Sequence, residues 1–160
     1  MKYKLIKDGN IIGSNNQIYN GKEINSTNIS IDHLRDHIIK IQLPKGDIIK
    51  IKVKYSCHCW TRKFDEHNDQ DQIKIIDGKN SRVFCNDRFN WSTNLNNLFT
   101  NLENNSFFLS NAERNYGTYS VQMNNNENLY TVFFSLKNEK GRFNGIRYQL
   151  VLFVESAYFR

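Results

Sequence analysis

The sequence predicts a single α+β domain dominated by an antiparallel β-sheet, arranged as a meander, with one or two short helices packed on it. Residues that favour strands, namely Ile, Val, Thr, Phe, Tyr and Trp, fill 50 of the 160 positions, whereas alanine occurs only twice. Apolar residues alternate with polar ones along several segments, and one central segment has helical spacing instead. We therefore treat residues 1–160 as one domain, with residues 1–29 as a loosely packed N-terminal arm.

The first regular elements are expected after this arm. Ser30 can cap a short helix over residues 31–38, where the apolar residues have helical spacing. Residues 39–43 and 49–55 then alternate apolar with polar, mostly lysine, side chains, and the turn-forming segment 44–47 separates them. This pattern predicts a β-hairpin.

Two strands and a helix are expected in the middle of the chain. Residues 73–76 and 82–85 predict strands on either side of an Asp77–Gly78 turn. A helix is expected over residues 92–102. Its core-facing side consists of four apolar residues at helical spacing: Leu95, Leu98, Phe99 and Leu102.

The last third of the chain predicts the meander itself. Four strands are expected, over residues 107–109, 118–123, 129–136 and 146–159. Lys140–Gly141 and Asn144–Gly145 are expected to form turns before the last strand. Because this strand is apolar on both faces between Leu150 and Val154, we expect it to be covered on both sides.

Charge and composition limit the functional classes. The net charge is +6 at pH 7, from 22 basic and 16 acidic residues, which favours contact with nucleic acid or another acidic surface. No apolar run reaches the roughly 18–20 residues of a membrane-spanning helix, and charges interrupt the apolar residues at the N-terminus, unlike in a signal peptide. With only three cysteines, we expect a cytoplasmic protein with no membrane contact and no disulfide framework.

The segment from Lys50 to Arg62 suggests a nucleic-acid-binding strand. If one strand continues to Trp60, three lysines, His58 and Trp60 point to one face, and Cys57 and Cys59 point to the other. Cations at alternate positions can follow the phosphates of a nucleic-acid strand, and an aromatic ring can stack on a base. A solvated sheet face, or an edge strand whose lysines prevent aggregation, explains the same pattern.

The three cysteines allow a zinc interpretation. Cys57, His58 and Cys59 are consecutive, with His67 and Cys85 further along the chain, and thiolates and imidazoles are zinc ligands. Zinc-binding turns place two to four residues between cysteines, however, whereas one residue separates these two. On a strand, His58 would also point away from both thiols. We therefore expect no metal site and no cofactor, and core burial is the alternative to metal ligation for the three cysteines.

His58 and Glu155 are the candidate catalytic residues. A carboxylate in an otherwise apolar strand is costly unless it is paired, so Glu155 either forms an ion pair with an arginine such as Arg147 or serves as a general base. RNA cleavage without a metal needs a base, an acid and cations that stabilise the phosphorane, and His58 suits the acid–base role. The residues expected to bind nucleic acid are Lys50, Lys52, Lys54, Trp60, Arg62, Arg82, Arg88, Arg114 and Arg147.

Between residues 90 and 160, a short predicted helix precedes a curled antiparallel meander with basic residues and a late tyrosine. This layout resembles the small bacterial ribonuclease toxins of the RelE type, and the resemblance implies no individual catalytic residue. The expected function is that of a small bacterial- or phage-type accessory protein that contacts nucleic acid, with RNA preferred, and in its boldest form a metal-independent endoribonuclease. The alternative is a non-enzymatic interaction module, an inhibitor or regulator, that binds an acidic protein surface.

Overall fold

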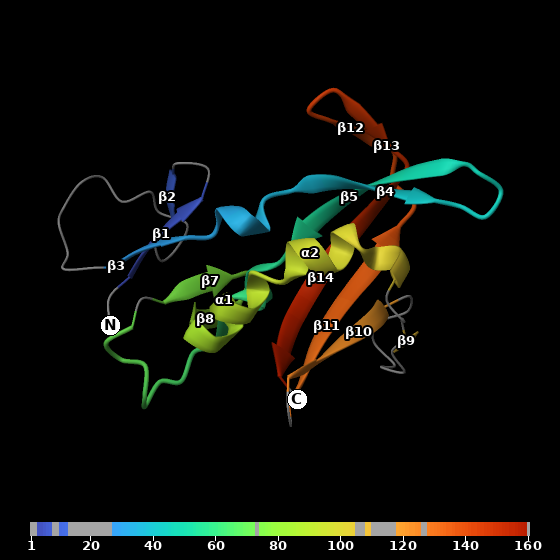
Figure 1. Cartoon of the computed structure of the whole chain (residues 1–160). Coiled ribbons are helices and arrows are strands. Elements are labelled where there is room, and N and C mark those ends of the chain that lie inside the picture. Colours follow the sequence, from blue (N-terminus) through green and yellow to red (C-terminus); the bar gives the residue numbers. More distant parts are fainter. Residues whose placement is uncertain are drawn as a thin grey trace.

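The structure, a computed structural model, describes residues 3–7, 10–12, 27–72, 74–104, 108–109, 118–125 and 128–159 of the chain (Figure 1). Strands dominate this part of the chain, and two short consecutive helices lie against the main sheet. The arrangement confirms the predicted α+β class.

The main sheet contains six strands in the order β4-β5-β14-β11-β10-β9. Their bounds are His37–Gln42 (β4), Ile48–Tyr55 (β5), Phe108–Leu109 (β9), Thr118–Asn125 (β10), Asn128–Lys137 (β11) and Leu150–Phe159 (β14). The predicted hairpin of β4 and β5 is confirmed. The antiparallel run through β9, β10, β11 and β14 is confirmed as well, for the strand segments that are described.

At its centre the main sheet is not antiparallel, contrary to the prediction. Leu150–Val154 of β14 pairs in parallel with Ile51–Tyr55 of β5. Parallel neighbours need a long crossover connection, and the chain between them supplies it by building a second sheet, both helices and the other strands of the meander. Val151 and Leu152 point to opposite faces of β14 and are 5% and 0% exposed, which confirms that this strand is covered on both sides.

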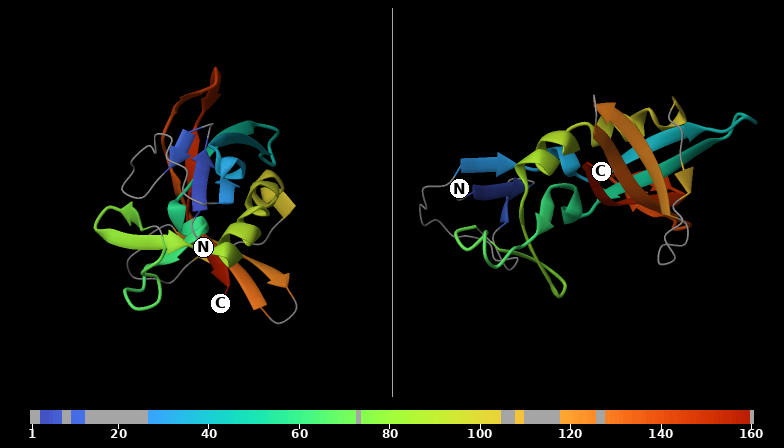
Figure 2. Two further views of the ribbon diagram at one scale, coloured as in Figure 1. Left: turned by 90° about the vertical axis from the view of Figure 1, so that its left-hand side faces the viewer. Right: turned by 90° about the horizontal axis from the view of Figure 1, so that it is seen from below.

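The helix predicted over residues 92–102 begins earlier and is bent. Helix α1 spans Asn86–Ser92 and helix α2 spans Leu95–Thr100. α1 ends because the side chains of residues 92–94 each hydrogen-bond a carbonyl three residues back. Both helices lie on the same side of the main sheet (Figure 2). The four predicted core residues are all at most 6% exposed: Leu95, Leu98, Phe99 and Leu102.

Smaller elements accompany the main sheet. One sheet has the order β2-β1-β3, with bounds Tyr3–Lys7 (β1), Asn10–Ile12 (β2) and Thr27–Ser30 (β3). Another has the order β6-β8-β7, with bounds Thr61–Lys63 (β6), Ile75–Asp77 (β7) and Asn80–Phe84 (β8). A hairpin of β12 (Gly141–Phe143) and β13 (Ile146–Tyr148) projects from the main sheet (Figure 1). Among the described residues, 3₁₀ turns lie at Asp32–Leu34 (η2), Cys57–Cys59 (η3) and Leu102–Asn104 (η4).

Two predicted local elements are wrong. The helix expected over residues 31–38 is reduced to the single turn η2, after which the chain enters β4. Lys140–Gly141 is not a turn, because Gly141 already belongs to β12. The turn of this hairpin lies at Asn144–Gly145, where φ is 49° and 77°. Positive φ at both central residues matches the right-handed twist of the strands, and asparagine and glycine adopt it most readily.

Strand β5 ends at Tyr55, as the alternation over residues 49–55 predicts, so the condition that one strand continues to Trp60 is not met. The Oγ of Ser56 accepts a hydrogen bond from the backbone N–H of His58 at 3.1 Å, and this bond starts the turn η3. The turn directs Cys59 and Trp60 into the core, where they are 0% and 5% exposed. Trp60 therefore does not share an exposed face with the lysines of β5.

The core contains two buried hydroxyls without a hydrogen-bond partner among the described residues, those of Tyr130 and Thr131. The Tyr130 ring packs on Trp91 and Phe159, at centroid distances of 5.4 and 5.5 Å. Burial raises the pKa of Tyr130 well above its ordinary value. A buried hydroxyl without a partner lowers stability by about 1–3 kcal/mol relative to a partnered one.

Tyr130→Phe is therefore expected to raise the free energy of unfolding by about 1 kcal/mol, because it removes only the hydroxyl. Urea-induced unfolding followed by circular dichroism measures the change. Tyr55→Phe is the matched control, since the Tyr55 hydroxyl hydrogen-bonds Nε2 of His37 at 2.9 Å, and it is expected to lower stability. Equal losses in the two variants would show that the Tyr130 hydroxyl has a partner.

Candidate functional site

The hairpin of β12 and β13 places two arginines directly opposite each other. Arg142 pairs with Arg147 in the register of the hairpin, and both side chains are exposed. Directly opposite residues have Cβ atoms about 4.5–5.5 Å apart, and like charges at this distance destabilise the pair. In the described part of the chain, no ion pair neutralises either arginine. The hairpin therefore holds two adjacent positive charges that a bound anion would stabilise.

The opposite face of this hairpin packs on the main sheet. Nζ of Lys52 lies 4.7 Å from the ring centroid of Phe143 and 5.6 Å from that of Tyr148. The same Nζ is 3.7 Å from Oδ2 of Asp36. The Tyr148 hydroxyl fills the space that a side chain at Gly141 would need. These contacts hold the hairpin against β5, and because side chains alternate along a strand, they leave the two arginines on the outer face.

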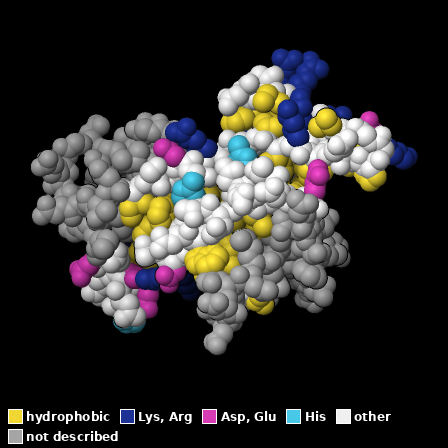
Figure 3. Space-filling model, in the orientation of Figure 1, with side chains coloured by type: hydrophobic (Ala, Val, Ile, Leu, Met, Phe, Trp, Pro, Cys, Tyr) yellow, Lys and Arg dark blue, Asp and Glu magenta, His cyan; other side chains and the backbone are white. Residues whose placement is uncertain are grey.

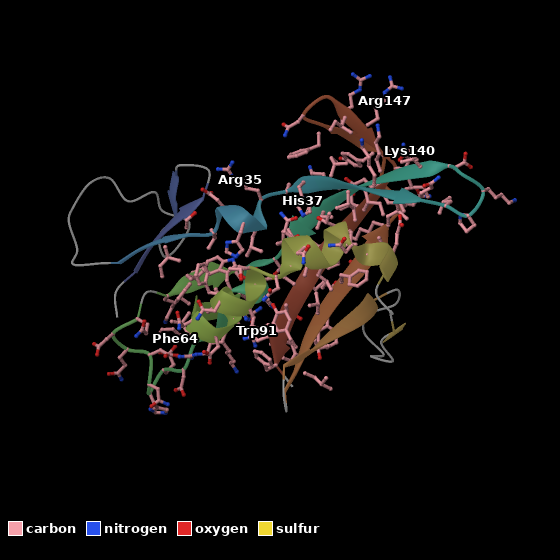
Figure 4. All side chains as sticks on the ribbon, in the orientation of Figure 1. Arg35, His37, Phe64, Trp91, Lys140 and Arg147 are labelled. Atoms are coloured by element: carbon pink, nitrogen blue, oxygen red, sulfur yellow. The ribbon has the colours of Figure 1, made fainter. Side chains whose placement is uncertain are left out.

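An open groove of about 470 Å³ lies along the hairpin. Its lining contains three cations and no acidic residue: Lys140, Gly141, Arg142, Arg147, Tyr148 and Gln149. Lys140 and Arg147 extend from this projecting part of the molecule (Figure 4). Lysine and arginine side chains gather on the same part of the surface in Figure 3. The groove is therefore a candidate site for an anion.

Two further lysines of the predicted binding set, Lys50 and Lys54, form no ion pair among the described residues. Lys50 lies directly opposite Lys40 in the register of β4 and β5, which makes a second like-charge pair. Strand β5 lies between β4 and β14, so the explanation of these lysines as protection of a sheet edge is wrong. Their part in nucleic-acid binding stays a prediction.

Three arginines of the predicted set are engaged within the fold. Arg62 forms two hydrogen bonds to the carboxylate of Asp69, at 2.7 and 2.6 Å, and this contact holds the pKa of Asp69 below its ordinary value. Nε of Arg82 donates to Oγ1 of Thr61 at 2.7 Å, and Nη1 of Arg88 donates to the Thr61 carbonyl at 2.9 Å. Arg62 thus links β6 to the loop that follows it, whereas Arg82 of β8 and Arg88 of α1 both bond Thr61 of β6.

His58 hydrogen-bonds a carboxylate other than the one with which it was predicted to act. Its Nε2 lies 2.7 Å from Oδ2 of Asp77, which ends strand β7. The side chains of His58 and Asp77 are 32% and 43% exposed. Cys57 lies beside this pair, and the three residues offer a sulfur, a nitrogen and an oxygen atom within 4.8 Å of one another. On the 3₁₀ turn, His58 and Cys57 face the same site, contrary to the expectation for a strand.

Glu155 lies in an irregularity of strand β14. Val154 pairs with Phe134 and Ser156 pairs with Phe133, so Glu155 is the extra residue of a β-bulge. The side chain is half-buried, and among the described residues it forms no ion pair with an arginine or with His58. Its role as a general base stays a prediction.

Several residues near these sites were not assigned from the sequence. Lys140 and Arg142 are absent from the predicted binding set, although the Asn144–Gly145 turn indicates a hairpin on which flanking cations lie close together. Asp77 was predicted only as a turn residue, and no local pattern links it to His58, which precedes it by 19 positions. The predicted binding residue Arg114 lies outside the described residues.

The fold and the candidate site define a small α+β protein with a mixed central sheet and an exposed basic hairpin. The chain belongs to the YjaZ family, whose sequence profile matches residues 18–160. Neither the comparison with curated proteins nor that with solved structures gives a match. The family match gives no support to the resemblance to RelE-type toxins. In the described part of the chain, every helix is too short or too polar to span a membrane.

Proposed function

We propose that this protein binds the phosphates of RNA through the hairpin of β12 and β13 and the lysines next to it. The observation that carries the proposal is the pair of Arg142 and Arg147, which lie opposite each other, exposed and without an acidic partner in the described chain. The repulsion between them costs folding free energy, and a bound phosphate relieves it. A planar guanidinium also binds phosphate oxygens through two parallel hydrogen bonds, which a lysine cannot form.

The positive surface extends beyond the hairpin, which favours a polyanion over a single small anion. Lys140 lies in the same groove, and Lys40 and Lys50 carry the charge onto the main sheet. Gln149 joins the hairpin to the main sheet through two hydrogen bonds with Lys50. Its Oε1 accepts from the Lys50 backbone N–H at 2.8 Å, and its backbone N–H donates to the Lys50 carbonyl at 2.9 Å. A flexible strand with several phosphates can contact both parts at once.

The test is the affinity of the full chain for a fluorescently labelled single-stranded RNA, measured by anisotropy at several salt concentrations. Arg142→Gln combined with Arg147→Gln is expected to weaken binding roughly tenfold or more. Because each lost phosphate contact removes about 0.7 from the slope of log affinity against log salt, the slope should become shallower by about 1.4.

A matched control removes the same number of charges elsewhere. Lys63 of β6 and Lys79, in the turn between β7 and β8, are exposed residues away from the hairpin. Lys63→Gln combined with Lys79→Gln is expected to change the slope by less than half as much. Equal losses in the two double variants would refute a defined site, and binding of wild-type protein without salt dependence would refute a phosphate interaction. DNA of the same sequence shows whether RNA is preferred.

Cleavage of the bound RNA is the stronger form of the proposal, and it depends on His58 and Glu155. The same RNA is incubated with the protein in the presence and absence of a chelator, and its length is examined. Chelator-resistant cleavage that His58→Ala or Glu155→Ala abolishes supports an endoribonuclease, whereas binding with intact RNA supports binding alone. If the wild-type protein does not bind RNA, the hairpin is assigned to the alternative partner, an acidic protein surface.

A further inference from the structure

We infer that Cys57, His58 and Asp77 form a binding site for a divalent transition metal of the zinc type. The three donor atoms lie within 4.8 Å of one another. Zinc bonds of about 2.0–2.3 Å in tetrahedral geometry place ligand atoms roughly 3.3–3.8 Å apart. Small side-chain rotations are therefore sufficient, and the metal replaces the hydrogen bond between His58 and Asp77. This site is separate from the basic hairpin and does not depend on RNA binding.

The backbone holds the two neighbouring ligands of η3 in place. Oγ of Ser56 accepts from the His58 N–H at 3.1 Å, and Oγ1 of Thr61 donates to the Cys57 carbonyl at 2.7 Å. Nη1 of Arg88 donates to the His58 carbonyl at 3.1 Å. On a 3₁₀ turn, consecutive residues are about 120° apart, so both side chains can reach one ion. On a strand they would lie on opposite faces.

The chemistry of the donors suits zinc. A thiolate, an imidazole and a carboxylate are its usual ligands, and sites with three protein ligands leave a fourth position for water or another molecule. The partial exposure of His58 and Asp77 gives an ion access from solvent. Binding releases the Cys57 proton to solvent, after which the two negative ligand charges balance the charge of the ion.

A nucleophilic role for Cys57 explains the same cluster less well. Reactive cysteines have a lowered pKa, whereas burial and the nearby Asp77 carboxylate raise the pKa of this thiol. Nε2 of His58 is hydrogen-bonded to the carboxylate of Asp77 and not to the Cys57 thiol. Arg82 is nearby, but its Nε and Nη2 donate to Thr61, at 2.7 and 3.0 Å. Asp77 thus pairs with the imidazole.

The other cysteines and a second histidine provide matched controls. Cys59 is fully buried, with its Sγ 3.9 Å from the Val154 carbonyl, and is not available to an ion. Cys85 and His67 are outside the three-residue cluster. The proposed ligands therefore differ from the residues considered for zinc in the sequence analysis. Asp77 is one of the ligands, and Cys59 is not.

The experiment titrates the reduced, metal-free full chain with Co²⁺ and then displaces it with Zn²⁺. The expected result is one bound equivalent, with a near-ultraviolet thiolate-to-cobalt charge-transfer band and the intense visible bands of four-coordinate cobalt. Cys57→Ser is expected to abolish the charge-transfer band. Asp77→Asn is expected to keep the band but to weaken binding at least tenfold, and Cys85→Ser and His67→Asn are expected to resemble wild type.

Thermal unfolding with and without Zn²⁺ provides a second readout. Because a ligand that binds the native state stabilises it, Zn²⁺ should raise the Tm of wild type and Cys85→Ser, but not that of Cys57→Ser. Circular dichroism identifies variants that fail to fold, and Asp77→Asn tests the site if Cys57→Ser is among them. The inference is overturned if wild type binds no cobalt, if Cys57→Ser keeps the charge-transfer band, or if Cys85→Ser loses it.

Discussion

Phe99→Ala is expected to lower the free energy of unfolding by about 3–5 kcal/mol, a large part of the stability of a domain of this size. Phe99 of α2 is fully buried. Its ring packs edge-on against Phe134 of β11 at a centroid distance of 5.4 Å, and against Tyr55 of β5 at 6.3 Å. One side chain thus joins the helix to strands on both sides of β14, and its removal leaves a cavity that the sheet cannot close.

Urea-induced unfolding measures this effect, with Ile48→Ala as the control. Ile48 is also a large apolar residue of β5, but it is 59% exposed, so its truncation is expected to change stability by about 0.5 kcal/mol or less. If the two substitutions had similar effects, α2 would not pack on the main sheet as the structure shows.

Thr61→Val is expected to destabilise the protein by about 2–4 kcal/mol, although the two side chains have the same shape. Thr61 is fully buried, and its Oγ1 donates to the Cys57 carbonyl and accepts from Nε of Arg82, both at 2.7 Å. Valine leaves Nε of Arg82, a residue that is only 9% exposed, without a partner, and the Cys57 carbonyl keeps only the Trp60 N–H at 3.2 Å. Unsatisfied buried groups, and charged ones above all, make such substitutions costly.

Two further threonine variants make this test specific. Thr61→Ser keeps the hydroxyl and is expected to recover most of the loss. Thr93→Val removes an exposed hydroxyl that donates to the Asn90 carbonyl at 2.7 Å, and a change of about 1 kcal/mol or less is expected. Chemical denaturation of the three variants measures these changes. The free energies of unfolding are compared with the same dependence on denaturant concentration (m-value) for each variant. A Thr61→Val protein as stable as wild type would contradict the hydrogen-bond network around Arg82.

The local elements of the fold were predictable because their signals are local. Apolar and polar residues alternate along β4 and β5, and Leu95, Leu98 and Phe99 have helical spacing, because each of these elements buries one face. The parallel pairing of β5 with β14 was not predictable in this way. It depends on segments about 100 residues apart, and no short-range pattern distinguishes a strand with an antiparallel neighbour from one with a parallel neighbour.

The candidate sites show the same limit. Basic and apolar residues alternate from Lys50 to Lys54, and His58 and Trp60 continue the period, so the sequence indicates one long strand. The structure ends β5 at Tyr55 because Ser56 caps a turn and because Cys59 and Trp60 gain more from burial in the core. That turn brings His58 within hydrogen-bond distance of Asp77. The spacing of the two residues in the sequence does not predict this contact. Of the two hairpin arginines only Arg147 was assigned, although the Asn144–Gly145 turn fixes the register that places Arg142 opposite it.

The position of β14 has a consequence for how the chain is assembled during its synthesis. Of the described strands it is the last to be translated, yet it lies in the middle of the main sheet, between β5 and β11. Until the ribosome has released residues 150–159, the pair β4–β5 and the unit β9–β11 have no common neighbour, and each exposes an unpaired apolar edge. A nascent chain that stalls before this point is prone to aggregate, and the sheet closes only when its central strand arrives.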